Sequence, residues 1–485
     1  MIPRRPALLE RLVARQPHGS ARTAGGHALK RVLGVWGLIG VGLGTMLGGI
    51  FATVGVGTLE AGPAVIASFL LSGLACVFVS LCYAELSSMV PIAGSAYTYA
   101  YATLGEFVAW IIGWDLILEY GISVAPIAAS WSGYAQAFLE NYGIALPTWA
   151  REAHLALAHG GIDVAHTHID LLAFLVVLVI TGLVAVGIKE SASVNGVLVV
   201  VQVFAIVAFV VALAGAIHPA HYAPFAPRGI GGIVNGAALV FFAYIGFDTV
   251  TVASEEARNP ERDVPLAVIG SLAIGAVLYI AIALVTVGVV PWAHIDKDAG
   301  MATAVRLGGN NPLLAAVLTV GAIAGTTTVM LTSLLGQVRI FYCMARDRML
   351  PPIVSRIDAR TRTPLVTTLT TGVLVAILAG IVPLDILLSL VNIGTLSAFA
   401  IVCAGVLVLR YVDPGARRPF RAPLSPLVPI LGLGMCLYLM FGGLSGGTWL
   451  RFVVWFLVGV GVYAAYGYRH SLLRPDGPIA SERAP

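Results

Sequence analysis

Ionisable side chains inside long apolar stretches are the residues of this sequence that could do chemistry. Asp115 and Glu119 lie four residues apart, so a helix would place both carboxyls on one face. Glu119 would then lie roughly 20 Å along that helix, near the middle of a bilayer. Asp248 and Lys189 also lie in or beside apolar stretches. Because charge inside a bilayer is costly, each is a candidate for ligand binding or proton transfer.

Each of these side chains also has a structural interpretation. Asp115 and Glu119 could make hydrogen bonds between neighbouring helices, and Asp248 could hold the geometry of a turn. From its position, Lys189 could extend its ammonium group to the lipid headgroups. Position in the sequence leaves these alternatives open.

Other kinds of site find little support in the sequence. The five cysteines have no paired spacing and the histidines form no HExxH motif, so we expect neither a metal site nor a disulfide framework. Phosphate-binding loops and GxSxG motifs are absent, so we expect no enzyme and no bound cofactor. The basic residues are spread over short loops rather than gathered on one face, which argues against nucleic acid as a partner.

The elements that would position the candidate residues are membrane-spanning helices. Hydrophobic residues make up 58% of the 485 residues and charged residues only 11%, whereas roughly 25% charged residues is usual for a soluble domain. A helix needs about 20 apolar residues to cross a bilayer, so the sequence predicts an all-α polytopic membrane protein with about 12 transmembrane helices. The expected spans are 34–58, 63–88, 105–139, 169–188, 190–216, 230–254, 265–290, 312–343, 365–382, 385–410, 424–444 and 449–468.

The placement of basic residues sets the expected orientation. With residues 1–33 inside the cell, the inner segments hold 23 of the 28 lysines and arginines. Inner loops of membrane proteins are enriched in these residues. We therefore expect two cytoplasmic tails, 1–33 and 469–485, on a multi-pass protein of the cell's inner (plasma) membrane.

Two glycine-containing stretches indicate an internal repeat. GLGTMLGG at 42–49 lies in the first expected span and FFAYIGF at 241–247 in the sixth. An offset of five spans would place the second half in the membrane with opposite orientation, as in transporters built from inverted repeats with interrupted helices. This predicts repeats over 34–216 and 229–411, with peripheral helices over 424–468. Glycine that serves only close helix packing is the alternative.

Several motifs, taken together and in order, carry a resemblance to a known family. They are GLGTMLGGIF at 42–51, PIAGSAYTY at 91–99, GWDLILEY at 113–120, GIKES at 187–191, FFAYIGFDTVTVASEEARNPERDVP at 241–265 and GQVRIFYCMARDRMLPP at 336–352. The chain resembles the cationic amino acid transporters of the amino acid–polyamine–organocation superfamily. The resemblance implies a leucine-transporter-like fold of five plus five helices. It also implies that Lys189 occupies the place of a sodium ion in sodium-coupled relatives and couples transport to protons.

Interrupted first and sixth spans would expose backbone groups to a ligand at mid-membrane. Free amides and the positive end of a helix dipole favour a carboxylate, and free carbonyls favour an ammonium group. The residues expected to hold the carboxylate are Gly48, Gly49 and Ile50. Those expected near the ammonium group are Thr45, Glu119, Phe242, Ala243 and Ile245. Family members usually carry Gly-x-Gly at the first break, where this chain has Leu47-Gly48-Gly49.

The resulting hypothesis is a secondary active transporter that moves amino acids by alternating access, with the proton as coupling ion. The expected partners are an amino acid substrate and the lipid bilayer. An amino acid exchanger, a polyamine transporter and an amino acid receptor without flux are the alternatives.

Overall fold

The computed structural model describes most of the chain between Leu33 and Ser471. The described residues are 33–89, 96–97, 100–101, 105–140, 142–154, 157–158, 161–162, 168–187, 192–309, 311–358, 360–361 and 363–471. Lys189, most of the 91–99 motif and most of both expected tails lie outside them.

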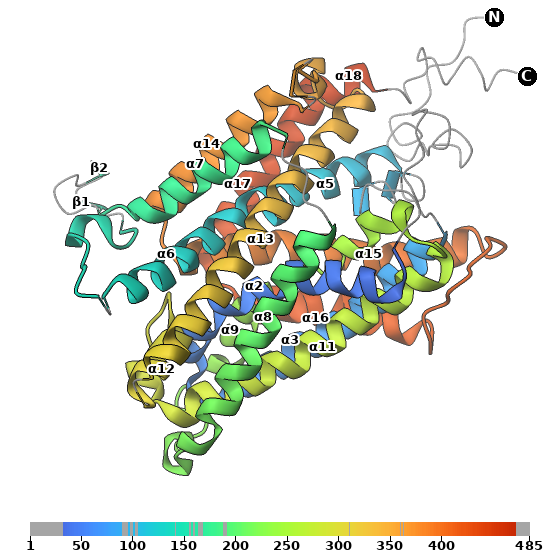
Figure 1. Cartoon of the computed structure of the whole chain (residues 1–485). Coiled ribbons are helices and arrows are strands. Elements are labelled where there is room, and N and C mark those ends of the chain that lie inside the picture. Colours follow the sequence, from blue (N-terminus) through green and yellow to red (C-terminus); the bar gives the residue numbers. More distant parts are fainter. Residues whose placement is uncertain are drawn as a thin grey trace, which may run out of the picture.

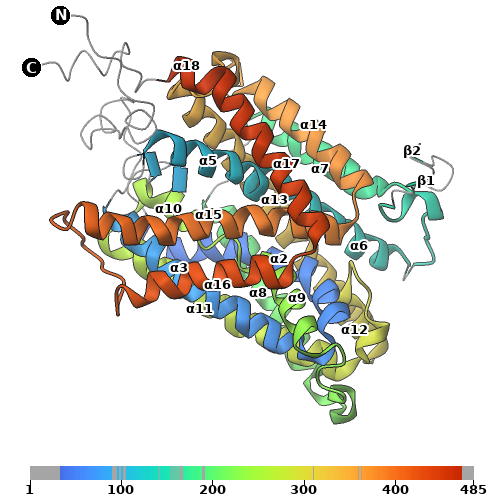
Figure 2. The ribbon, with the colours of Figure 1, turned by 180° about the vertical axis from the view of Figure 1, so that it is seen from behind.

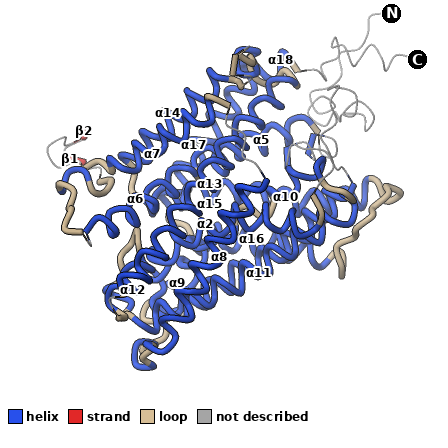
Figure 3. Tube along the Cα trace, in the orientation of Figure 1, coloured by secondary structure: helices blue, strands red, loops and turns tan. Residues whose placement is uncertain are grey.

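Apolar helices dominate the structure, and Figure 3 shows them as a single bundle. The first repeat expected from the sequence contains α2 (Val35–Ala61), α3 (Val65–Met89), α5 (Glu106–Leu116) continued by α6 (Val124–Glu140), α7 (Leu171–Ala185) and α8 (Ala192–Leu213). The second contains α9 (Gly229–Val240) with α10 (Thr249–Val252), α11 (Pro260–Val289), α13 (Pro312–Arg346), α14 (Leu365–Ile381) and α15 (Leu384–Val412). Two further helices, α16 (Leu427–Gly443) and α17 (Gly446–Val462), follow.

These helices confirm the expected all-α polytopic architecture. Eight stretches of the described residues are long and apolar enough to cross a membrane, and the first of them, Val35–Met89, contains both α2 and α3. The shorter apolar helices α7, α14 and α16 complete twelve spans within the described part of the chain. Outside the spans lie the short helix α12 (Gly300–Leu307) and a hairpin of β1 (Leu157–Ala158) and β2 (Gly161–Ile162).

The helices pair in the way that two inverted repeats require. Helix α3 packs on α11, α7 on α14, α2 on α9 and α6 on α13, so four of the first five spans meet the span five later. One exchanged pair is also present, since α2 with α11 corresponds to α9 with α3. In Figures 1 and 2, α7 and α14 run together along one edge of the bundle and α3 and α11 along the opposite edge. The exact ends of the repeats, 34–216 and 229–411, stay a prediction.

The expected interruption of the first span is wrong, because α2 is a continuous α-helix from Val35 to Ala61. Its glycines serve close packing instead. A Cβ atom on Gly49 would lie 2.8 Å from the Cα of Ala243, and one on Gly48 would lie 2.5 Å from Val329 Cγ2. Leu47, which precedes the two glycines, is fully buried. Leucine favours the helix, and the amides of Gly48, Gly49 and Ile50 are used inside it.

The expected interruption of the sixth span is confirmed. After α9 ends, a 3₁₀ turn, η8 (Phe241–Tyr244), leads into a non-helical segment before α10 begins at Thr249. Gly246 adopts a φ of 117° there, a conformation that favours glycine. A Cβ atom on Gly246 would also lie 2.9 Å from Thr45 Cβ, so the break packs directly against the unbroken α2.

Gly49→Ala tests whether this helix contact limits the fold. The added methyl group would meet backbone atoms of Ala243 and Phe242, at 2.8 Å and 3.2 Å, which cannot turn away. We expect a loss of about 1–3 kcal/mol in stability, as for an overpacked core, and a lower melting temperature in detergent. Gly40→Ala in the same helix is the control, because no atom would lie within 4 Å of its Cβ. Equal melting temperatures for the two variants would contradict this account.

Candidate functional site

A small central cavity lies where α2, the third span and the break of the sixth span meet. Its walls contain five of the eight residues expected to bind substrate: Thr45, Gly49, Glu119, Phe242 and Ile245. Its volume is about 30 Å³, far below the roughly 300–1,000 Å³ of ligand pockets. The site predicted from sequence is therefore assembled, although the cavity is too small for an amino acid.

The other three expected residues, Gly48, Ile50 and Ala243, do not line this cavity. Gly48 faces α13, where a Cβ would lie 3.1 Å from the carbonyl oxygen of Gly325. Ile50 is fully buried. The carbonyl of Ala243 accepts a hydrogen bond of 2.8 Å from the Tyr279 hydroxyl, so this group already has a protein partner.

Thr45 joins α2 to the break of the sixth span. Its Oγ1 lies 2.9 Å from the carbonyl oxygen of Gly246 and 2.8 Å from Thr249 Oγ1. The same carbonyl also accepts hydrogen bonds from the amide and the hydroxyl of Thr249. Thr45 thus supplies a hydrogen-bond partner for the break as well as part of the cavity wall.

Two buried carboxyls face the same cavity. Glu119 is 2% exposed and Asp248 is fully buried, and both line the cavity wall. The Tyr120 hydroxyl donates to Asp248 Oδ2 over 2.7 Å. Both oxygens of Glu119 and the Oδ1 atom of Asp248 are buried without a hydrogen-bond partner among the described residues. The pair can therefore accept a hydrogen bond from an ammonium group or share a proton.

Cations do not balance these carboxyls within the described part of the chain. The ion pairs found there join other acidic residues, chiefly at the ends of the bundle. Burying two ionised carboxylates side by side without a cation is strongly unfavourable. A proton or the ammonium group of a ligand would offset this cost.

A π-helical turn, η3 (Ile117–Ile122), carries Glu119 and Tyr120 into the cavity. Such turns insert one extra residue into a helix and are frequent at functional sites. The sequence predicted a regular helix here and singled out Glu119 but not Tyr120. The adjacency of the two residues in the GWDLILEY motif was the one available signal.

Hydroxyl groups of α13 mostly serve their own helix. Thr326, Thr328 and Thr332 each lie within hydrogen-bond distance of the carbonyl four residues earlier, the usual arrangement in membrane helices. Ser333 instead lines the central cavity. Lys189, which the sequence placed near these hydroxyls, lies outside the described residues.

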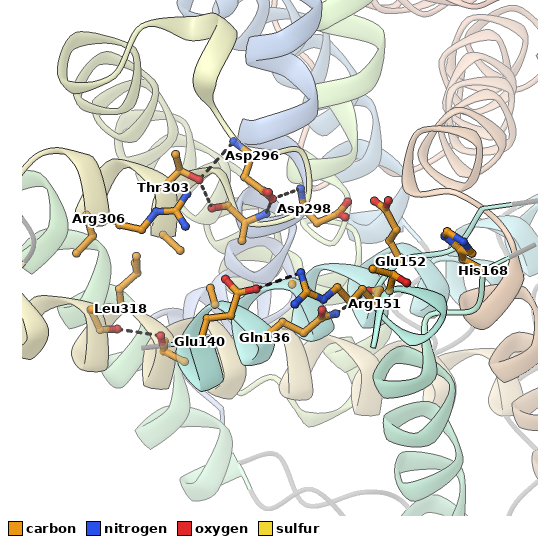
Figure 4. Close-up of a pocket in the computed structure, with 18 residues that line it drawn as sticks. Gln136, Glu140, Arg151, Glu152, His168, Asp296, Asp298, Thr303, Arg306 and Leu318 are labelled. Carbon is orange, nitrogen blue, oxygen red and sulfur yellow. Dashed lines mark hydrogen bonds and ion pairs between the residues drawn. The ribbon is translucent and has the colours of Figure 1, made fainter. Parts of the chain in front are cut away.

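A second, larger cavity of about 690 Å³ opens at one end of the bundle. Figure 4 shows it between the end of α6, the turn at 148–152, the segment 296–306 and the start of α13. Its charged lining residues are Glu140, Arg151, Glu152, Asp296, Asp298 and Arg306. Acidic groups outnumber basic ones, so the cavity favours cations. The sequence did not predict it, because its walls come from three separate loops.

The segment 296–300 separates this outer cavity from the central one. A Cβ atom on Gly55 of α2 would lie 2.4 Å from the carbonyl oxygens of Asp296 and Lys297. A Cβ atom on Gly133 of α6 would lie 3.0 Å from that of Asp298. Lys297 forms an ion pair with Asp385 at the start of α15. The segment therefore closes the bundle on this side.

Buried polar contacts close the opposite end of the bundle. Glu85 of α3 is 1% exposed and forms ion pairs with Arg410 and Arg418. The Tyr97 hydroxyl donates to Asp347 at the end of α13 over 2.8 Å. These contacts tie the described parts of α3, α13 and α15 together at this end of the bundle.

Comparisons with known proteins agree with this architecture. The profile of a family described as "Amino acid permease" matches residues 33–464. The branched-chain amino acid permease BcaP of Bacillus subtilis is 42% identical over 455 residues, covering 93% of this chain and 96% of the relative. A methylthioribose transporter of the same organism is also 42% identical, covering 92% and 95%. A vacuolar cationic amino acid transporter 4 of Arabidopsis thaliana is 40% identical, covering 80% and 65%.

The carboxyl of Asp298 should make the stability of the folded protein depend on pH. Burial, reinforced by the carboxylate of Asp296, raises the pKa of Asp298 from 3.8 to about 7. Between these values the folded protein holds a proton that the unfolded chain releases, so stability falls as the pH rises through this range.

We expect Asp298→Asn to melt at a higher temperature than the parent at pH 8 and at the same temperature near pH 4, measured by thermal unfolding in detergent. Glu261→Gln, at an exposed position at the other end, should follow the parent at both values. A constant offset of Asp298→Asn at all pH values would contradict the titration of this group.

Proposed function

Because the chain belongs to the amino acid permease family of the amino acid–polyamine–organocation superfamily, we propose that it is a secondary active transporter, not an enzyme, that moves amino acids by alternating access. The motifs that carried the resemblance lie within the matched residues 33–464. We infer that the protein lies in the plasma membrane with both ends in the cytoplasm. An even number of spans puts the two ends on one side, and the arginine-rich loops favour the inside.

The observation that carries the proposal is the pair of buried carboxyls at the break of the sixth span. Glu119 offers two oxygens without a partner to a cavity at the centre of the bundle. The ammonium group of an amino acid needs such acceptors when it loses water inside the membrane. The same oxygens can carry a proton, which supports the proton as coupling ion.

The small volume of the cavity supports alternating access rather than a channel. A cavity of about 30 Å³ with packed segments at both ends admits no substrate until one side separates. Movement of α2 away from the break would enlarge the cavity where Thr45 and Gly49 line it. The carboxylate role predicted for Gly48, Gly49 and Ile50 requires α2 to open locally, because their amides now bond within the helix.

The lining favours a substrate with an apolar side chain. Ile127, Phe242, Ile245 and Val329 form the apolar part of the wall. Branched-chain amino acids, which the BcaP relative carries by its name, combine an ammonium group with an apolar side chain. Methylthioribose, named for another relative of equal identity, is a sugar derivative without an ammonium group and is the second candidate substrate.

Uptake by the purified protein in liposomes tests the substrate. We expect radiolabelled leucine to accumulate when the outside is acidified, because the cavity offers both carboxyls and an apolar wall. Unlabelled isoleucine and valine should compete, whereas methylthioribose and the polyamine spermidine should not. Competition by methylthioribose alone would overturn the amino acid assignment. Binding of leucine without uptake would favour the receptor alternative. Uptake that occurs only when the liposomes are preloaded with amino acid would favour the exchanger.

Lys189 supplies a second test, of the coupling ion. If its ammonium group gives up a proton during transport, Lys189→Arg should abolish the stimulation of uptake by an inward pH gradient, because arginine keeps its proton at accessible pH. A snorkelling anchor would tolerate the same substitution. Lys297→Arg is the control, since it keeps the charge that pairs with Asp385. Normal pH-driven uptake by Lys189→Arg would exclude Lys189 as the coupling group.

A further inference from the structure

Asn392 of α15 holds the end of α9 at the point where the sixth span breaks. Its Nδ2 atom donates to the carbonyl oxygen of Ala238 over 2.7 Å and to that of Leu239 over 3.1 Å. Asn392 is fully buried and does not line the central cavity. A side chain of the tenth span therefore supplies hydrogen-bond partners for the last turn of α9.

The carbonyls of Ala238 and Leu239 are available for this contact because the helix changes its hydrogen bonding there. In an unbroken α-helix each carbonyl accepts from the amide four residues later, which for these two lies in η8. Instead α9 ends at Val240, and η8 continues as a 3₁₀ turn, whose bonds span three residues. A carbonyl that loses its α-helical partner in hydrocarbon needs another. The carboxamide of Asn392 has two N–H donors, one for each carbonyl.

The acceptor side of the same amide is not satisfied. The Oδ1 atom of Asn392 is buried without a partner among the described residues, and the flanking residues Val391 and Ile393 are fully buried and apolar. An amide in such surroundings is costly unless its hydrogen-bonding groups are used. The two donor contacts to α9 are what offsets this cost.

The residues just after this contact form part of the apolar wall of the cavity. Phe242 and Ile245 line the cavity, and the Ile245 amide donates to the carbonyl of Phe242 over 3.1 Å. The Tyr279 hydroxyl of α11 donates to the next carbonyl, that of Ala243, over 2.8 Å. The point at which the chain leaves α9 sets where this wall begins, so the Asn392 contact fixes the wall from the side of α15.

We propose that Asn392 is a positioning residue for substrate binding, which keeps α9 from continuing through η8 and thereby holds Phe242 and Ile245 in the cavity wall. Without the side-chain amide, the two carbonyls would draw the backbone amides of η8 into α-helical bonds. The wall residues would then turn away, because α and 3₁₀ turns place successive side chains at different angles. The inference rests on the proposed amino acid transport and adds a residue that acts through the sixth span without touching the substrate.

Asn392→Leu removes both donors and keeps a side chain of similar size. We expect the KM for leucine uptake into liposomes to rise about tenfold or more, since two hydrogen bonds that hold the wall are lost. The KM for alanine should rise less, because a methyl group reaches little of the apolar wall. Loss of folded protein alone would lower the maximal rate and leave both KM values unchanged.

Thr395→Val is the matched control on the same helix. Thr395 is also fully buried, and its Oγ1 atom lies 3.1 Å from the carbonyl oxygen of Val391 in α15 itself. The variant therefore loses a buried hydrogen bond without releasing α9. We expect both KM values to stay at the parental level.

Asn392→Ser provides a second measurement if Asn392→Leu does not fold. The serine side chain is one atom shorter, and its hydroxyl can bond to the carbonyl four residues earlier in α15, so the same selective rise in the KM for leucine should appear. A parental KM for leucine in a folded variant at this position, or an equal rise for leucine and alanine, would overturn the positioning role and leave amino acid transport in place. A parent protein that takes up neither amino acid would overturn the proposed function and this role with it.

Discussion

In hydrocarbon, every backbone polar group needs a partner within the protein, and the centre of this structure depends on how that demand is met at one broken helix. The sixth span gives up helical hydrogen bonds between Phe241 and Asp248. Thr45 lies against the carbonyl of Gly246, and the Tyr279 hydroxyl donates to that of Ala243. Both partners come from neighbouring helices, so the break fixes the positions of α2 and α11 around it. The central cavity lies beside this break.

Charge is the second constraint at the same place. Asp115, Glu119 and Asp248 bring three carboxyls into the bundle core, while the described ion pairs lie at its ends. The exposed pairs among them, such as Arg417 with Glu261, are hydrated by solvent and are worth little individually. The central carboxyls have no such support and must be neutralised by protons or by a ligand's ammonium group. Their free energy therefore depends on what occupies the cavity, which is the property a coupled transporter requires.

Much of this fold follows from the sequence. Apolar runs of about 20 residues determine the spans, and proline-containing separators mark several of their ends. The expected boundaries therefore agree with the helices from α2 to α17 to within several residues. The expected cavity residues Thr45, Gly49, Glu119, Phe242 and Ile245 meet as predicted. The prediction of a break in α2 was wrong because glycine is typical both of helix breaks and of close helix packing. The neighbouring Ala243 and Val329 show that close packing applies here. The π turn at Ile117–Ile122 and the outer cavity arise from tertiary packing. Neither could be predicted from the types of residue in the sequence.

The closed state also indicates where opening must begin. Thr45 and Gly49 are the points at which α2 touches the sixth-span break, and Gly48 is where it touches α13. Glycine brings no side chain of its own into these contacts. The hydroxyl of Thr45 is the polar link in this contact, and an incoming ammonium group could compete with it for the carbonyl of Gly246. Substrate binding would then weaken the attachment of α2 at the moment the cavity must grow, which ties occupancy of the site to movement of the helix that closes it.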